Sequence, residues 1–511
     1  MQNNDKKVLL RISNLKQYFP LKGGRFVKAN DGITLDIYEG ETFGLVGESG
    51  CGKSTLGRTI LQLYHQTYGR TMYYGRSLDD LAPKYVIDTV KNLKSRRAKL
   101  RELEQKRDKL EAEYAKLSEK EQYAKHGELD TARKLAEDAL LDITKIVGGF
   151  LVVDDLDPVI AAYSKDYAIA HKLSNMEEKR QELQVDVDDA EYAKKTAEEA
   201  GKSGKDGQLQ KAQEKLKQCD DQIAALRAQL DAGRQEIEAL RAPYANDPEF
   251  QKYEAYRDDG IDLARLEYNE MRRLRRDMQL IFQDPYSSLN PRMSVGQIIS
   301  EGMQAHNMIK KKDARMQEMV LKIMDDCGLA PYFLHRFPHQ FSGGQRQRIG
   351  IARALATKPK FVVCDEAVSA LDVSIQAQII NLLLDLKEQQ NLTYMFITHD
   401  LSVVKYISDR VGVMYLGTMV ELAAADEIFH HPIHPYTEAL LNAIPTTDTV
   451  GAKELSILEG DIPSPVNPPK GCKFHTRCKY CTEICTQVVP EWEEVRPNHF
   501  VACHHKLEVK E

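Results

Sequence analysis

The order of hydrophobic and polar positions divides the chain into two α/β-like parts and a helical part between them. Near the N-terminus, the apolar runs "KVLLRI", "GITLDIY" and "ETFGLVG" lead into a glycine-rich stretch, and "KSTLGRTILQLY" follows with helical spacing. This order predicts a strand, a loop and a helix. From Met278 to about residue 425 the alternation returns, with "KFVVCDE" and "TYMFITHD" as buried strands between helical patterns. We therefore expect an α/β fold whose two parts are far apart in the sequence.

The segment from about residue 80 to 265 is charged and almost free of proline. Two positions of a heptad repeat are filled by Leu216, Ile223, Leu230 and Ile237 and by Cys219, Leu226, Gly233 and Leu240. A looser seam runs earlier, through Leu93, Leu100, Leu103, Leu110, Tyr114 and Leu117. The more apolar stretch "GGFLVVDDLDPVIAAYSKDY" separates the two arms, and "GKSGKDG" at 201–207 interrupts the second half. The pattern predicts a coiled-coil insertion, as an antiparallel hairpin or small bundle with a compact tip.

Such an insertion explains why the two α/β parts are separated. Antiparallel arms bring their two ends together, so the chain can leave and re-enter one edge of a domain without disturbing its fold.

Length and charge exclude some classes of protein. A chain of 511 residues exceeds what one hydrophobic core usually supports, which favours two to four domains. The net charge of −6 gives no electrostatic support for tight nucleic-acid binding. The N-terminal stretch lacks an apolar signal core with a cleavage site, and no apolar run is long enough to span a membrane. We therefore expect a cytosolic location.

The nine cysteines are unevenly distributed. Five of them crowd the C-terminal end, at Cys472, Cys478, Cys481, Cys485 and Cys503. Because the cytosol keeps thiols reduced, this crowding favours a metal or cluster site over disulfides. The spacing C-x5-C-x6-C-x17-C fits a thiolate-bound iron–sulfur cluster or a structural zinc equally well. Reduced cysteines that pack a small core are the remaining alternative.

The glycine-rich stretch "GESGCGKST" fits the phosphate-loop pattern from Gly47 to Ser54. Glycines let backbone N–H groups turn toward phosphate oxygens, Lys53 can reach the outer phosphates, and the Ser54 hydroxyl can bind Mg²⁺. The similar "GKSG" at 201–204 has neither the strand nor the helix, so we interpret it as a polar turn.

A second acidic motif ends a buried strand at Asp365 and Glu366, in "FVVCDE". At this position Asp365 can lie beside Mg²⁺, and Glu366 can take a proton from an attacking water. The similar "LVVDD" at 151–155 lies inside the helical insertion, so we expect Asp154 and Asp155 to be surface or capping residues.

Four further stretches complete the set: "IFQDP" at 281–285, "FSGGQRQRIGIARAL" at 341–355, "SALD" at 369–372 and "FITHD" at 396–400. With the phosphate loop and the "FVVCDE" strand, they resemble the ATPase subunits of ABC transporters. The resemblance implies an α/β fold class, with an ABC-type P-loop nucleotide-binding domain, the helical coiled-coil insertion and a small cysteine-rich C-terminal extension. It covers about residues 8–78 and 268–505 and does not cover the insertion.

The resemblance also implies roles for single residues. ATP would be held by Phe19, with Tyr18 as the alternative, and by Gly47, Ser49, Gly50, Gly52, Lys53, Ser54 and Thr55. Mg²⁺ would be bound by Ser54, Gln283 and Asp365, and catalysis would use Glu366 as general base with His399 and Gln283. The signature residues would act on the nucleotide of an opposite subunit; they are Ser342, Gly343, Gly344 and Gln345. Asp372 would lie at the junction of the two subunits. Phe341 and Ala367 depart from the usual leucine and proline of the pattern without affecting the chemistry.

The C-terminal sequence indicates a branch of the family. "HHPIHPYTEALLNAIP", "GCKFHTRCKYCTEIC" and "FVACHH" resemble the extension of peptide and nickel importer ATPases, and the wording is closest to the F-type subunit. The four-cysteine pattern of these relatives is matched here by Cys472, Cys478, Cys485 and Cys503. The resemblance therefore implies a 4Fe–4S cluster, with Zn²⁺ as the alternative. Cys481 can substitute as a ligand or be a bystander.

The expected organisation has four parts: residues 1–78 and 268–428 form the ATPase domain, 79–267 the insertion and 429–511 the extension. The expected function is ATP-driven uptake of dipeptides or oligopeptides. The implied partners are two membrane permeases, a D-type ATPase subunit and, indirectly, an external peptide-binding protein, so that the chain would lie peripherally at the cytoplasmic face of the membrane. The alternatives are a nickel importer, a scaffold subunit with weak hydrolysis, and a soluble coiled-coil ATPase of the chromosome-maintenance type. The cargo and the role of the insertion stay open.

Overall fold

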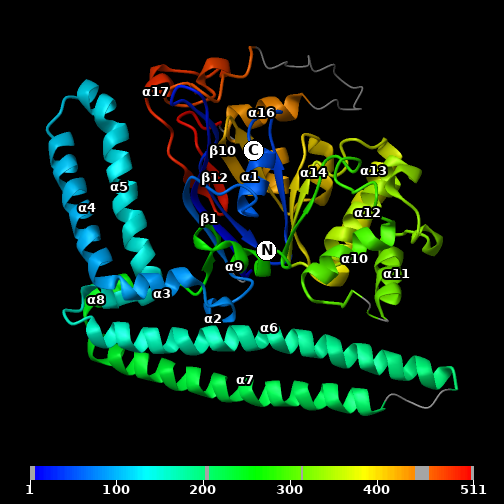
Figure 1. Cartoon of the computed structure of the whole chain (residues 1–511). Helices are drawn as coiled ribbons and strands as arrows, with labels where there is room; N and C mark the ends of the chain where they lie inside the picture. The colour runs from blue at the N-terminus through cyan, green and yellow to red at the C-terminus, as the bar shows by residue number, and fades with distance from the viewer. Residues whose placement is uncertain (1–5, 202–205, 312, 314, 444–459, 508–511) are drawn as a thin grey trace. The chain divides into compact units, whose positions relative to one another are not determined.

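The computed structural model describes residues 6–201, 206–311, 313, 315–443 and 460–507. The chain divides into two compact units (Figure 1). One unit contains residues 1–75, 271–311 and 316–511, and the other contains residues 76–270 and 312–315. We call them the sheet unit and the helical unit.

The main sheet of the sheet unit has the strand order β11-β12-β10-β9-β3-β8-β7-β6. Its centre is parallel: β9 (Arg410–Tyr415), β3 (Thr42–Val46), β8 (Thr393–Ile397), β7 (Phe361–Asp365) and β6 (Met278–Ile281). Strands β3, β7 and β8 are buried along their whole length, which explains why they appear in the sequence as continuous apolar runs.

The C-terminal extension continues this sheet. β10 (Thr418–Ala424) pairs antiparallel with β9 and with β12 (His499–Val501), and β11 (Glu493–Arg496) pairs with β12. The buried Glu421 of β10 accepts hydrogen bonds from the N–H groups of Ile433 and His434 and contacts the His499 ring. Because a buried carboxylate needs such partners, Glu421 ties the extension to the edge of the sheet.

A second sheet pairs β1 (Val8–Pro20) antiparallel with β2 (Phe26–Tyr38) and β4 (Tyr68–Tyr73). The helices of the sheet unit are α1 (Lys53–Ile60), α10 (Val295–Ala305), α11 (Met316–Asp326), α12 (Gly343–Leu355), α13 (Val373–Gln390), α14 (Leu401–Ile407), α15 (Ala425–His430), α16 (Pro435–Asn442) and α17 (Glu483–Gln487).

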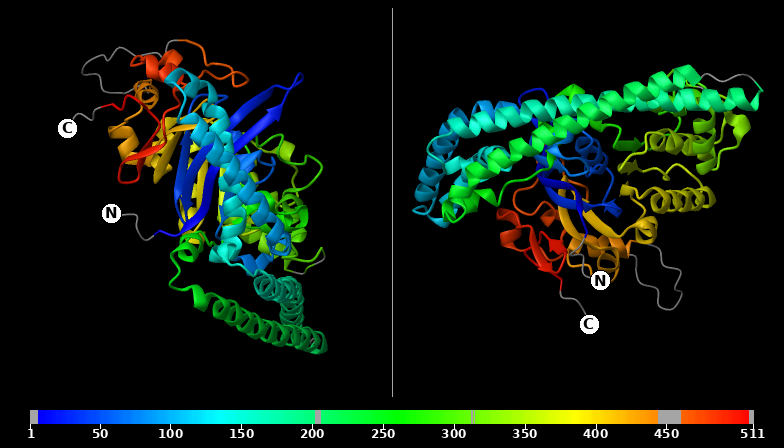
Figure 2. Two further views of the ribbon diagram at one scale, coloured as in Figure 1. Left: turned by 90° about the vertical axis from the view of Figure 1, so that its left-hand side faces the viewer. Right: turned by 90° about the horizontal axis from the view of Figure 1, so that it is seen from below.

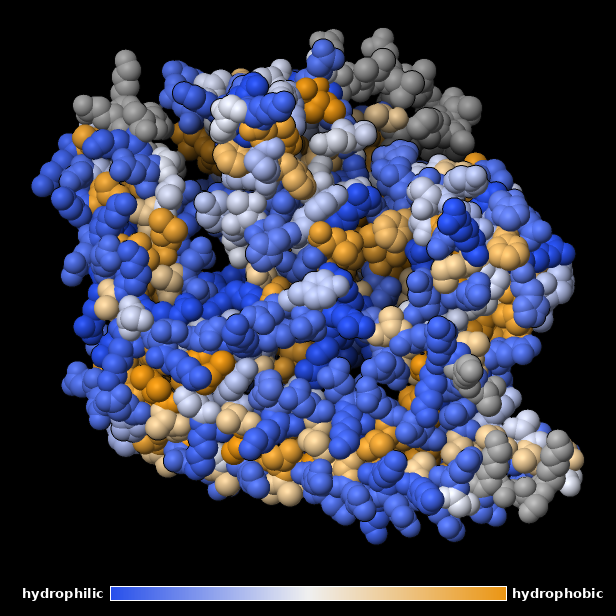
Figure 3. All heavy atoms as spheres, in the orientation of Figure 1, coloured by the Kyte–Doolittle hydropathy of each residue, from blue (hydrophilic) through white to orange (hydrophobic). Residues whose placement is uncertain are grey.

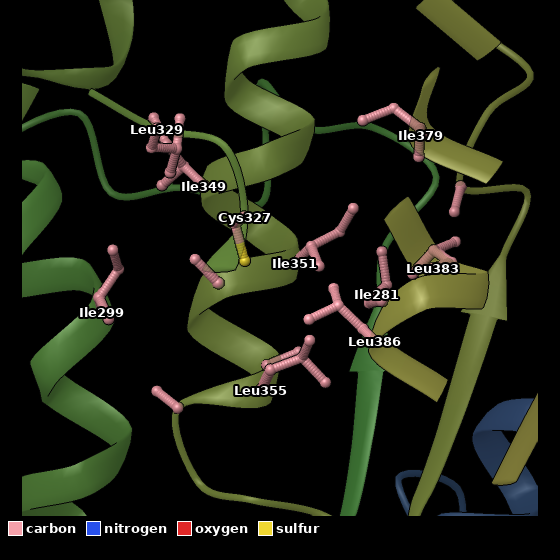
Figure 4. Close-up of a cluster of buried hydrophobic side chains, with 14 of the residues drawn as sticks. Ile281, Ile299, Cys327, Leu329, Ile349, Ile351, Leu355, Ile379, Leu383 and Leu386 are labelled. Carbon is pink, nitrogen blue, oxygen red and sulfur yellow. The ribbon is translucent and has the colours of Figure 1, made fainter. Parts of the chain in front are cut away.

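The core beside β6 and β7 is apolar and centred on α12. Figure 4 shows Ile349, Ile351 and Leu355 of α12 among side chains of β6 and α13, including Ile281 and Leu386. This packing fixes where α12 begins, and α12 carries the "SGGQ" residues at its first turn.

The helical unit contains two antiparallel helix pairs rather than one hairpin (Figures 1 and 2). The first pair is α4 (Leu93–Tyr114) with α5 (Glu119–Val147), and the second is α6 (Asp157–Glu199) with α7 (Asp206–Arg241). The unit also contains α2 (Leu78–Leu81), α3 (Lys84–Lys91), α8 (Pro248–Glu254), the short β5 (Ile261–Asp262) and the start of α9 (Tyr268–Leu274).

The apolar segment at 148–156 therefore does not form a tip. It follows α5 and packs in a core with the ends of both helix pairs, where Phe150 contacts Phe250 edge-on at 5.6 Å. The segment is apolar because it is buried there, which corrects the expected compact tip; of the two expected forms, a hairpin or a small bundle, the two helix pairs correspond to the bundle. Asp154 and Asp155 are exposed, and Asp155 Oδ1 accepts the N–H of Asp157 just before α6. Residues 202–205 of the "GKSGKDG" stretch lie outside the described residues.

Five of the eight heptad positions of α7 are buried, and the other three, Leu216, Leu226 and Leu240, are half-buried. Cys219, Ile223 and Leu230 pack with Ala170 and Leu173 of α6 in one apolar cluster. The face of the helical unit seen in Figure 3 is otherwise mainly hydrophilic. Within the part of the chain that the structure describes, no helix has both the length and the apolar character needed to cross a membrane.

Candidate functional site

The phosphate-loop pattern forms a tight turn between β3 and α1. Gly52 stands at the N-cap of α1 with φ +103°, a conformation that favours glycine. A Cβ there would come within 2.2 Å of the Ala29 carbonyl oxygen, so no larger residue fits. Asn30, which is fully buried, donates from Nδ2 to the Gly52 carbonyl at 3.0 Å. The turn leaves the first N–H groups of α1 available to an anion.

The ammonium of Lys53 lies over this loop. Its Nζ donates to the carbonyl oxygens of Gly47 at 2.7 Å and Glu48 at 3.0 Å, and the residue is only 5% exposed. Because both partners belong to the phosphate loop, they hold the ammonium charge of Lys53 at the loop, where it can meet phosphate oxygens.

Ser54 and Asp365 meet across two elements that are distant in the sequence. The Ser54 hydroxyl donates to Asp365 Oδ1 at 2.5 Å, and Arg58 of α1 donates to Oδ2 at 3.1 Å. Asp365 is 1% exposed at the end of β7. The pair presents a hydroxyl and a carboxylate, the oxygen ligands that Mg²⁺ prefers.

Glu366 follows directly, and its backbone has φ +48°, a rare value for a residue with a side chain. Its N–H donates to the Ile397 carbonyl of β8, which fixes this conformation. Gln283 Nε2 donates to Glu366 Oε2 at 2.5 Å, and His399 Nδ1 lies 3.5 Å from Oε1. The carboxylate is therefore oriented by residues that follow β6 and β8, the two strands on either side of β7.

Several of these residues line one open cleft of about 390 Å³. Of the expected residues, its lining contains Phe19, Ser49, Gly50, Gly52, Lys53, Ser54, Thr55, Gln283 and Glu366. Phe19 packs edge-on against Tyr64 at 5.3 Å. Tyr18 does not line the cleft, and its hydroxyl hydrogen-bonds to Asp31 instead.

Other expected residues lie outside this lining. Gly47, Asp365, His399, the 342–345 stretch and Asp372 are not part of it. Ser342 caps α12 by accepting the N–H of Gln345, and Asp372 caps α13 by accepting the N–H of Ile375 at 3.0 Å. The latter hydrogen bond lowers the pKa of Asp372. A Cβ at Gly344 would lie 2.5 Å from the Ile375 side chain of α13, so a larger residue does not fit there without a shift.

Sequence reasoning missed part of the lining. Val27, Lys28, Ala29, Leu416, Gly417 and Pro465 also line the cleft. They come from β2, the β9–β10 turn and the extension, and no motif in the sequence marks them. Only the pairing of β1 with β2 and the folding back of the extension bring them to the phosphate loop.

Four cysteines of the extension line one small cavity: Cys472, Cys478, Cys485 and Cys503. Burial, with a contribution from the neighbouring cysteines, raises the pKa of Cys472 to about 11 and that of Cys503 to about 12. Cys481 is exposed and does not line the cavity. Among the described residues, no group of three or more His, Cys, Asp or Glu side chains has the arrangement of a metal site.

Comparisons with known proteins give a consistent result. The ABC transporter family model matches residues 30–251 and 250–369, and the model described as the C-terminal region of oligopeptide/dipeptide transporters matches residues 420–485. The oligopeptide transport ATP-binding protein AppF of Bacillus subtilis is 52% identical over 250 residues, which cover 48% of this chain and 75% of AppF.

A second relative matches over nearly its whole length. The putative oligopeptide transport ATP-binding protein YkfD of Bacillus subtilis is 34% identical over 498 residues, 97% of this chain and 95% of YkfD. Among solved structures, cbiO1 from Clostridium perfringens is 15% identical with a TM-score of 0.41, over 83% of this chain and 92% of that chain.

Proposed function

The chain belongs to the ABC transporter family and carries the C-terminal region of oligopeptide/dipeptide transporters, and from this premise we propose that it is the ATP-binding subunit of a peptide importer. It hydrolyses ATP to drive uptake of dipeptides or oligopeptides through membrane permeases. The observation that carries the proposal is the convergence of Lys53, Ser54 and the Glu366–Gln283 pair on one cleft.

ATP is the substrate of this cleft. Phe19 lines one side and offers a ring on which adenine can stack, while Ser49, Gly50 and Gly52 of the phosphate loop line the other. The loop N–H groups and Lys53 hold the phosphates, and Lys53 exchanges its carbonyl partners for phosphate oxygens.

The residues present fit Mg²⁺, because Ser54 and Asp365 already present a hydroxyl and a carboxylate within hydrogen-bond distance. Ser54, Gln283 and Asp365 would hold the ion. When bound, the ion neutralises charge on the phosphates. Arg58 orients the Asp365 carboxylate through its hydrogen bond to Oδ2.

Glu366 is the general base. Gln283 and His399 flank its carboxylate, so that one oxygen can accept the proton of the water that attacks the γ-phosphate. His399 is exposed, and its ring is free to steady the γ-phosphate. Because Gln283 is bound to Glu366, the water position and the base are set together.

The active unit is a dimer of ATPase domains. Ser342, Gly343, Gly344 and Gln345 lie outside the cleft of their own chain, as expected if they act on nucleotide held by an opposite subunit. Asp372 belongs to the same junction. The second subunit is a D-type ATPase, and the dimer drives two permeases that receive peptide from an external binding protein.

The location that follows is peripheral, at the cytoplasmic face of the membrane. Peptide is favoured over nickel as cargo because the relatives AppF and YkfD carry oligopeptide transport in their names. The match of residues 420–485 to a transporter region also disfavours the chromosome-maintenance alternative.

The cysteine cavity is the site of a thiolate-bound group, a 4Fe–4S cluster or Zn²⁺. The donor type is suitable, since four sulfurs line one cavity, although among the described residues they do not have the arrangement of a metal site. The buried Nε2 of His434, which lacks a hydrogen-bond partner among the described residues, belongs to a ring lining that cavity. Cys472, Cys478, Cys485 and Cys503 would hold the group. Iron, sulfide and zinc analysis of anaerobically purified protein distinguishes the two, and the absence of all three contradicts the site.

The insertion at 79–267 is a separate coiled-coil part between the two halves of the ATPase domain, 1–78 and 268–428, with the extension at 429–511. Its paired helices can brace a partner subunit or recruit a regulator. The equal alternative is that it is a tolerated addition without an essential role.

Affinity purification of the tagged chain from detergent-solubilised membranes, followed by mass spectrometry, tests the proposal. We expect two permease subunits and a second ATPase to accompany it. Recovery of the chain alone in the soluble fraction, or with nucleic-acid proteins, would contradict an importer.

A further inference from the structure

The cysteine-containing segment 472–478 of the extension is bound to the phosphate loop. Arg477, with a side chain only 5% exposed, donates from Nη1 to Glu48 Oε2 at 2.7 Å and from Nη2 to Oε1 at 3.1 Å. Glu48 is the residue after Gly47, inside the phosphate-loop pattern. Two parallel hydrogen bonds fix the carboxylate in both position and direction.

The backbone of Glu48 is held from the same extension. Its N–H donates to the Tyr436 hydroxyl at 2.9 Å, while its carbonyl accepts from Lys53. Side chain, N–H and carbonyl of one loop residue are thus all engaged, and two of the three partners come from residues more than 380 positions away in the sequence.

A second contact joins the segment to another residue of the cleft lining. Lys473 donates from Nζ to Asp31 Oδ2 at 3.1 Å and to the Leu416 carbonyl at 3.2 Å. Asp31 of β2 also accepts the hydroxyl of Tyr18, the neighbour of Phe19 on β1. Leu416 lines the cleft itself. Lys473 therefore fixes the strands that carry Phe19 and the turn beside it.

The two basic residues are set by one folded turn. Between them Phe474 is 2% exposed and packs against the rings of Tyr415 and Tyr436, each with its centroid 5.2 Å away. The Cys472 N–H donates to the Cys485 carbonyl at 2.8 Å, which closes the loop around the cysteine cavity. Because the turn cannot shift without moving Phe474, Lys473 and Arg477 move together.

We propose that segment 472–478 is a positioning element for ATP, in which Arg477 holds the phosphate loop through Glu48 and Lys473 holds the adenine side through Asp31. The proposal rests on the proposed function of the cleft as an ATP site. Arg477 also neutralises a carboxylate in the phosphate loop. Without it, the unpaired Glu48 repels the phosphates and the loop loses its fixed geometry.

The test measures ATP affinity and steady-state ATPase kinetics of the full chain with its partner subunits. Arg477→Met should raise Kd and KM for ATP by about tenfold or more, since the half-buried Glu48 carboxylate loses its partner. The kcat at saturating ATP should stay within about twofold, because Arg477 does not touch the reacting atoms. Arg477→Lys, which keeps the charge without the double hydrogen bond, should lie between.

A double variant separates electrostatics from general damage. Glu48→Gln in the Arg477→Met background removes the unpaired charge and should recover most of the lost affinity. Lys479→Met is the matched control, because Lys479 is an exposed basic residue directly after the segment and pairs with Glu438 at 2.9 Å. It should leave Kd and KM unchanged.

The possible outcomes are distinguishable. A wild-type chain that binds no ATP contradicts the proposed function and this inference with it. A wild-type chain that binds ATP while Arg477→Met binds equally well overturns the inference alone. A fall in kcat of Arg477→Met at constant KM, with no recovery in the double variant, also overturns the inference. That pattern means loss of folded protein and not a weaker hold on ATP. If Arg477→Met does not fold, the same comparison is made with Arg477→Lys and Lys473→Met. An unchanged KM for ATP in both variants would then overturn the inference.

Discussion

At Asp31, the cost of burying a carboxylate is outweighed by its partners. Burial opposes ionisation, but the Lys473 ammonium, the Tyr18 hydroxyl and the nearby Lys16 together lower the pKa of Asp31 to about 2. Burial likewise lowers the pKa of Lys473, against the attraction of Asp31. The pair is therefore an ionic contact inside the molecule, and it joins the extension to the nucleotide cleft.

This contact predicts a pH dependence. Because the folded-state pKa of Asp31 lies below its ordinary value of 3.8, its contribution to stability is present above pH 4 and is lost as the pH falls toward 2. The shift corresponds to about 2 kcal/mol, of which about 1 kcal/mol is lost by pH 3. Urea unfolding of wild type and Asp31→Asn at pH 6 and pH 3 measures this.

The free energy of unfolding should fall by different amounts in the two proteins between pH 6 and pH 3. The difference belongs to Asp31, because both proteins share all other titrating groups. Wild type should lose about 1 kcal/mol more than Asp31→Asn between the two pH values. Equal losses would mean that Asp31 is not held ionised by Lys473 and Tyr18.

At the scale of elements, the sequence predicts correctly the helices and strands that depend on neighbouring residues alone. The strand, loop and helix around Lys53 follow from a buried apolar run, glycines and helical spacing, and the structure contains them as β3 and α1. The helical character of 93–114 and 206–241 follows from the apolar spacing in the same way. The compact tip was predicted wrongly, because an apolar stretch such as 148–156 fits a tip or a base equally until its neighbours are known.

The helical unit should be dispensable for ATP binding. Every residue that lines the cleft belongs to the sheet unit, and the Tyr73 hydroxyl lies 3.1 Å from the Asp277 carboxylate, so the chain leaves and returns at nearby points. Replacing residues 82–264 with a short glycine–serine linker should leave the Kd for ATP within about threefold of wild type.

Isothermal titration calorimetry with ATP measures this, and the same deletion with Lys53→Ala is the control that should not bind. A folded deletion variant that fails to bind ATP would contradict the account. Transport by the deletion variant then decides whether the insertion has an essential role.

At the scale of the whole molecule, the site was predictable where each motif ends a strand. Asp365 and Glu366, Gln283 and His399 follow β7, β6 and β8, neighbours in a parallel sheet, so their meeting follows from topology. Arg477 and Pro465 could not be predicted as neighbours of the phosphate loop, because their contacts depend on how an irregular extension folds back. The absence of Ser342 and Asp372 from the cleft was expected only through the resemblance.

The central claim is that Glu366 in this cleft turns over ATP to import peptide. Uptake of a labelled peptide mixture is the most direct measurement, in cells that lack the chain and are supplied with wild type or Glu366→Gln. Wild type should restore uptake, and Glu366→Gln should reduce it and ATP turnover by about a hundredfold or more while ATP binding persists. Uptake by Glu366→Gln at the wild-type rate, or no restoration by wild type, would contradict the account.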